Sequence, residues 1–93
     1  MRIVFKESFV IRLEKQINFI SLDSPIRARK FKADLFHRIK EIPKGPFRYR
    51  KSIYFEDDSI RDLVYKGYTI VFRINDARIE VFGFVKFQNK PTE

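Results

Sequence analysis

Apolar residues recur at helical spacing in the first half of the chain. The first stripe has intervals of four, four and three residues and consists of Phe9, Leu13, Ile17 and Ile20. This spacing predicts an amphipathic helix with one buried face. Ser8 is the expected N-cap, because a serine hydroxyl can accept a hydrogen bond from an unpaired backbone N–H of the first turn.

A second helix is predicted after one short break. Ser24 is its expected N-cap and Pro25 its first residue, because proline lacks only an N–H that would be unpaired there. Its apolar side consists of Ala28, Phe31, Leu35, Ile39 and Ile42, with Phe36 beside them. Pro43, Gly45 and Pro46 end the helix. Two amphipathic helices joined by so short a turn form an antiparallel hairpin.

The other apolar residues alternate with polar ones at the period of a β-strand. The predicted strands are residues 2–5, 60–65, 68–74 and 79–85, with turns at Lys66-Gly67 and Asn75-Asp76. Residues 47–59 mix basic, aromatic and acidic side chains, and part of this segment is expected to be an edge strand or an ordered loop. Successive strands with short connections form an antiparallel meander.

The helical hairpin must bury its apolar stripe against one face of this sheet. We therefore predict an α+β domain with the order β-α-α-β-β-β, in which the hairpin packs on one face of a small, twisted, mainly antiparallel sheet. Regular alternation assigns Thr69, Val71, Arg73 and Lys86 to the opposite face, where a partner or substrate would meet a rigid platform. Residues 1–93 are expected to form a single domain whose last residues, 90–93, are a frayed tail.

Composition narrows the possible functions. The chain has no cysteine and one histidine, which excludes disulfides, thiolate zinc sites and multi-histidine metal sites, and we expect neither a metal nor a cofactor. No signal peptide or membrane span is evident, so a cytoplasmic location is expected. The formal charge is +8, which favours polyanions or acidic proteins as partners.

Several strings, taken in order, resemble the RelE/ParE superfamily of bacterial toxins from type II toxin–antitoxin systems. Residues 24–31 (SPIRARKF) are similar to the start of the second helix in ParE-like chains, and residues 60–63 (IRDL) resemble the Val-Arg-Glu-Leu strand. Residues 67–74 (GYTIVFRI) and 79–85 (IEVFGFV) resemble the last two strands. The similarity extends over nearly the whole chain and is closer to ParE-like than to RelE-like members.

The resemblance implies a toxin that blocks growth until a cognate antitoxin neutralises it. ParE-type members act on DNA gyrase, whereas RelE-type members cut messenger RNA on the ribosome, and one fold carries both mechanisms. The positions of the RelE-type lysines hold Ile60 and Asp62 here, and the arginine position holds Thr69. The C-terminal tyrosine has no counterpart. A gyrase-binding toxin that is not an enzyme is therefore the first hypothesis.

Two alternatives stay open. An mRNA endonuclease would have to use a different set of catalytic residues, for which Arg73, Lys86 and Lys90 are the candidates, with Arg78 beside them. A non-toxic relative would retain only antitoxin binding.

Contact residues are expected for two partners. The expected target-binding residues are Arg61, Arg73, Arg78 and Lys86. We predict that the antitoxin is acidic, partly disordered and encoded by an adjacent gene. The residues expected to contact it are Phe9, Leu13, Arg27, Lys30, Phe82 and Phe84.

Two residues have competing interpretations. Arg61 lies on the same side of its predicted strand as Leu63. It is therefore expected either to form a structural ion pair with Asp57, Asp58 or Asp62, or to contact the target. His37 is the only side chain that titrates near neutral pH, but it lies on the helix side away from the core and is expected to be solvated.

Overall fold

The computed structural model describes residues 1–86. Its elements in chain order are β1 (Arg2–Phe5), α1 (Glu7–Asp23), α2 (Pro25–Lys40), the short 3₁₀ helices η1 (Ile42–Lys44) and η2 (Pro46–Arg48), β2 (Arg50–Lys51), β3 (Ile60–Tyr65), β4 (Tyr68–Ile74) and β5 (Arg78–Lys86). The predicted order is confirmed, and the mixed segment after α2 contributes the short edge strand β2. The expected frayed tail, residues 90–93, lies outside the described residues.

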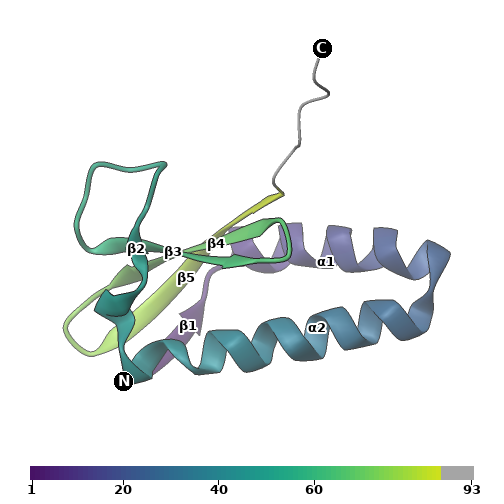
Figure 1. The fold of residues 1–93 in the computed structure, drawn as a ribbon, viewed down its shortest axis with the longest axis horizontal. Helices are drawn as coiled ribbons and strands as arrows, with labels where there is room; N and C mark the ends of the chain where they lie inside the picture. Colours follow the sequence, from purple (N-terminus) through teal and green to yellow (C-terminus); the bar gives the residue numbers. More distant parts are fainter. Residues whose placement is uncertain (87–93) are drawn as a thin grey trace, which may run out of the picture.

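The five strands form one open sheet in the order β1-β5-β4-β3-β2. All neighbouring pairs are antiparallel except β1 and β5, which run parallel. The α1–α2 hairpin covers one face and projects beyond the turn between β3 and β4 (Figure 1). The predicted α+β class is therefore confirmed. Neither helix within residues 1–86 has the length and apolar character that crossing a bilayer requires.

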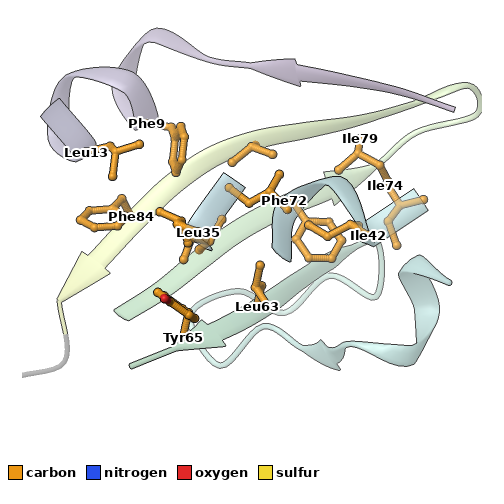
Figure 2. Packing of buried hydrophobic residues seen from close by; sticks show 13 residues of the cluster. Phe9, Leu13, Leu35, Ile42, Leu63, Tyr65, Phe72, Ile74, Ile79 and Phe84 are labelled. Carbon is orange, nitrogen blue, oxygen red and sulfur yellow. The ribbon is translucent and has the colours of Figure 1, made fainter. Parts of the chain in front are cut away.

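The core lies between the hairpin and the sheet. Phe9 and Leu13 of α1 and Leu35 of α2 point toward Phe72 and Phe84 on the sheet (Figure 2). Ile39 and Ile42 are also fully buried, although α2 ends at Lys40 and Ile42 belongs to η1. Most residues of the predicted apolar stripes therefore form the core, with Ile17, Phe31 and Phe36 packed at its margin, whereas Ile20 is only partly buried and does not join it.

The two predicted helix caps have different outcomes. Ser24 caps α2 as expected, because its Oγ accepts a hydrogen bond from the N–H of Arg27 at 3.1 Å. Ser8 does not cap α1: the N-cap position is Lys6, which makes no side-chain capping bond. The Ser8 hydroxyl instead donates to the carbonyl oxygen of Phe82 on β5, at 2.8 Å.

A β-bulge in β5 explains why that carbonyl is available. Val71 pairs with Gly83, but the next residue of β4, Phe72, pairs with Val81, so Phe82 is an extra residue without a partner. An extra residue leaves the ladder locally unpaired and shifts the alternation of the strand. The Ser8 hydroxyl supplies one of the missing hydrogen bonds.

The bulge changes which side chains share a face. Past Phe82, Phe84 lies in the core and Lys86 pairs with Tyr68. Tyr68 is on the hairpin side, because its ring contacts Phe31 of α2 and its hydroxyl accepts a hydrogen bond from Gln16 of α1. The prediction that Lys86 lies on the same face of the sheet as Arg73 is therefore wrong, because regular alternation does not hold through a bulge.

Gly83 provides a test of the bulge. A Cβ built at Gly83 would lie 2.8 Å from Cβ and 3.0 Å from Cγ2 of Val71, its partner on β4. We expect Gly83→Ala to lower the free energy of unfolding by roughly 1–3 kcal/mol through overpacking. Urea denaturation measures the change.

The matched control is Gly83→Ala in a Val71→Gly background, where both crowded atoms, Cβ and Cγ2 of Val71, have been removed. The added methyl group should then cost much less, because the two substitutions interact. An equal cost in both backgrounds would contradict the packing described for the bulge.

Candidate functional site

The sheet face opposite the hairpin carries a cluster of charges on β4 and β5. Glu80, which is largely buried, accepts a hydrogen bond from Nε of Arg78 at 3.0 Å and forms an ion pair with Nη2 of Arg78 at 2.7 Å. Arg73 contacts the other carboxylate oxygen only at 4.0 Å. Arg78 is therefore the main partner of Glu80, and the half-exposed guanidinium of Arg73 retains donors for another acceptor.

One aromatic ring contacts Arg73, and a second ring packs against the first. Its guanidinium carbon lies 5.6 Å from the ring centroid of Phe82, the bulged residue. Phe82 in turn makes an edge-to-face contact with Phe55 of the loop before β3, with ring centroids 5.7 Å apart. Because Phe55 is 45% exposed, this face combines an available cation with accessible aromatic surface. We call Arg73, Phe82 and Phe55 the platform site.

A carboxylate lies near the edge of the platform site. The hydroxyl and the N–H of Ser59 both donate to Oδ1 of Asp57, at 2.7 and 2.9 Å. These hydrogen bonds hold the pKa of Asp57 below its usual value, and the positive charge of Arg73 acts in the same direction. Asp57 is therefore ionised at neutral pH and keeps the loop folded beside the sheet.

The residues proposed for catalysis do not come together. Lys86 lies on the hairpin side of the sheet, with its Nζ 5.6 Å from the ring centroid of Phe19 on α1. Arg73 is on the opposite side, and Lys90 lies outside the described residues. His37 is exposed on α2, as expected, and no group of three His, Asp or Glu side chains within residues 1–86 could hold a metal ion.

Arg61 has a structural role, but the prediction that it pairs with an aspartate is wrong. Its Nε donates to the carbonyl of Asp58 at 2.8 Å, and its Nη1 donates to the carbonyls of Phe47 and Tyr49 at 3.2 and 3.0 Å. The guanidinium also stacks 4.9 Å from the Phe47 ring. Backbone carbonyls accept from Nε and Nη1 of this arginine, so it ties η2 to the start of β3.

Asp62 pairs with a different arginine. Its buried Oδ2 accepts hydrogen bonds from Nε of Arg50, at 3.2 Å, and from the N–H of Ile53, at 3.1 Å. Oδ1 has no hydrogen-bond partner among the described residues. Asp62 thus anchors β2 and the loop that follows it to β3.

A groove lies at the free end of the hairpin, and it is the second candidate site. Its volume is about 670 Å³. It is lined by Phe19, Ile20, Leu22 and Asp23 of α1, by Arg27, Lys30, Phe31 and Asp34 of α2 and by Lys66 of the β3–β4 turn. Leu22 is 85% exposed, and Phe19 is also accessible. Such large apolar side chains exposed together indicate an interaction surface. We call this the hairpin groove.

The expected antitoxin contacts divide between the core and the surface. Phe9, Leu13 and Phe84 are buried in the core and have almost no accessible surface for a partner. Arg27 and Lys30 line the hairpin groove, where they pair with Asp23 at 2.9 Å and Asp34 at 3.1 Å. Phe82 belongs to the platform site on the other side of the sheet.

Sequence reasoning overlooked Phe19 and Leu22. Both lie outside the apolar stripe of α1, so they cannot be buried with it. A large apolar residue off the buried stripe of an amphipathic helix was the signal that could have identified the hairpin groove.

The family comparison agrees with this fold. The sequence profile described as "ParE toxin of type II toxin-antitoxin system, parDE" matches residues 3–86, which is nearly the whole chain. The chain belongs to the ParE toxin family. The predicted resemblance to ParE-like toxins is therefore confirmed.

Solved structures show the same fold for this toxin. A chain from a structure titled "Chromosomal ParDE TA system from P. aeruginosa" superposes with a TM-score of 0.77 at 15% sequence identity, over 95% of this chain and 97% of that one. At this identity the likeness shows the fold alone. No curated protein matches the sequence.

Substitutions of Arg61 and Arg73 give a matched test of a structural role and a surface role. We expect Arg61→Ala to lower the free energy of unfolding by roughly 1–3 kcal/mol, because three backbone carbonyls lose their donor. Arg73→Ala should change it by less than about 0.5 kcal/mol, because its ion contact is long and half-exposed. Urea denaturation of both variants measures the difference, and equal losses would contradict these assignments.

Proposed function

We propose that this ParE-family toxin inhibits growth by binding DNA gyrase and that a cognate antitoxin neutralises it. The observation that carries the proposal is the position of Arg73 and Lys86 on opposite sides of the sheet. RNA cleavage through the 2′-hydroxyl requires a base, an acid and positive charge around one phosphate. The described residues offer a binding surface instead of such a set.

The positions that carry catalytic groups in RelE-type toxins support the same conclusion. Ile60, Asp62 and Thr69 occupy them here, and all three are buried. Asp62 is committed to Arg50 and to the backbone of Ile53. None of them can reach a substrate phosphate without first becoming exposed.

The platform site has the composition of a protein-binding surface. Arginines and aromatic side chains dominate binding energy at protein interfaces, particularly when they are packed against each other. Arg73 stacks on Phe82, and Phe55 extends the aromatic surface outward. We therefore assign target binding to Arg73 with Phe55 and Phe82, and leave Arg61 out of the target-binding set.

The hairpin groove suits the antitoxin. Its exposed apolar side chains can receive one face of an amphipathic helix, and Lys66, the lining cation that is not paired with Asp23 or Asp34, favours acidic residues on that helix. We expect this acidic segment to belong to an antitoxin encoded by an adjacent gene and to be disordered when free. A gyrase target places the toxin in the cytoplasm.

Gyrase and ribosome assays on the purified toxin test the target. We expect inhibition of DNA supercoiling and no cleavage of messenger RNA on translating ribosomes. Arg73→Ala should raise the concentration that gives half-inhibition at least about tenfold, equivalent to a loss of about 1.4 kcal/mol of binding. Lys51→Ala, an exposed cation at the far edge of the sheet, is the control and should inhibit like the wild type.

Cut transcripts with unchanged supercoiling would establish the endonuclease alternative. If the toxin affected neither reaction and its expression did not slow growth, it would be a non-toxic relative that only binds an antitoxin.

Substitution of Leu22 tests the antitoxin site separately. Leu22→Asp places a negative charge in the hairpin groove, so we expect it to weaken antitoxin binding at least about tenfold while gyrase inhibition persists. Ile11→Asp, on an exposed position of α1 that does not line the groove, is the control. Isothermal titration with the adjacent-gene product measures both affinities, and an equal loss in the two variants would argue against the groove.

A further inference from the structure

The positive charge of the chain is concentrated on α2. This helix carries six basic side chains and one acidic one, a net charge of +5 in 16 residues, on a chain with a net charge of +8. Two of its cations, Arg27 and Lys30, pair with Asp23 and Asp34. A third, Arg38, lies 5.5 Å from the ring centroid of Tyr65. The three that remain are available for an external anion.

These three cations lie on one side of the helix. Arg29, Lys32 and Lys40 are exposed, and none of them forms an ion pair with another described residue. At 3.6 residues per turn, Lys32 is about one turn and Lys40 about three turns beyond Arg29. They extend over roughly 16 Å along the axis at 1.5 Å per residue. We call them the basic row of α2.

The basic row differs from the two protein-binding candidates. A stable protein interface requires buried apolar or aromatic anchors at its centre. The only large apolar side chain of α2 that is exposed is Ile26, in the first turn, and Ala33 lies between the cations of the row. A surface with aligned cations and no apolar anchor matches the requirements of a phosphate backbone, which is bound mainly through charge.

We propose that the basic row of α2 binds the phosphate backbone of duplex DNA without sequence preference. Long lysine and arginine side chains spaced along one helix side can each reach a phosphate, and the contacts carry no base information. The choice of DNA over RNA rests on the proposed function, because the proposed target works on duplex DNA. The row would hold the toxin on the DNA that gyrase engages, while the platform site contacts the enzyme.

The test measures binding of the purified toxin to a labelled duplex of about 20 base pairs, by fluorescence anisotropy, in the absence of gyrase. Three phosphate contacts predict that the affinity falls roughly 40-fold between 50 and 200 mM salt. The double variant Arg29→Gln/Lys40→Gln retains one contact, so its affinity should fall only about 3- to 4-fold over the same range. Glutamine keeps the helix propensity, and circular dichroism checks that α2 is intact.

The matched control is Arg12→Gln/Lys51→Gln, which removes the same charge from two exposed positions outside α2. It should retain the wild-type salt dependence. Three results would overturn the proposal: no binding at 50 mM salt, an equal change of salt dependence in both double variants, or tighter binding of polyglutamate or of an RNA strand than of the duplex. A toxin that binds DNA in this way but leaves supercoiling intact would refute the gyrase proposal and not this one.

Discussion

The extra residue in β5 determines how the two faces of this toxin are used. Phe82 has no partner on β4, and its carbonyl receives the hydroxyl of Ser8 from the first turn of α1. Because a bulge shifts the alternation of a strand by one residue, every side chain after Phe82 lies on the face opposite to the one that regular pairing predicts. Phe84 thereby completes the core, and Phe82 itself points away from the hairpin.

This shift separates the chemistry on the two faces. Arg73 remains on the open face with Phe82 beneath it, while Lys86 lies over Phe19 on the hairpin side. The open face thus carries Arg73, the Glu80-paired Arg78 and an aromatic surface, whereas RNA cleavage would need a cluster of catalytic groups around one phosphate. Binding is the function that we propose for this arrangement. The molecule then has three distinct surfaces, namely the platform site, the hairpin groove and the basic row of α2.

Much of this fold could be predicted from the sequence, because local signals agree with tertiary packing. The apolar stripes, the Ser24-Pro25 start of α2 and the Lys66-Gly67 turn all have local physical causes, and Lys66 and Gly67 do adopt positive φ. The errors have long-range causes. Ser8 meets a carbonyl 74 residues away, the bulge depends on strand pairing, and Arg61 is satisfied by backbone carbonyls that no pattern of charges reveals.

The site residues were harder to predict for the same reason. Phe9 and Leu13 follow a spacing that predicts burial. An apolar residue can either pack in the core or contact a partner, and in this fold both residues are buried in the core. Phe19 and Leu22 stay exposed because the stripe of α1 leaves no place for them beside the sheet.

Arg73 and Lys86 lie on different faces of the sheet, and nuclear Overhauser effects in solution test this arrangement directly. The account predicts effects between the ε-methylene protons of Lys86 and the ring of Phe19, which disappear in a Phe19→Leu variant. Effects from Lys86 to the ring of Phe82 or to the side chain of Arg73 would contradict it. They would place both cations on the open face and return RNA cleavage to consideration.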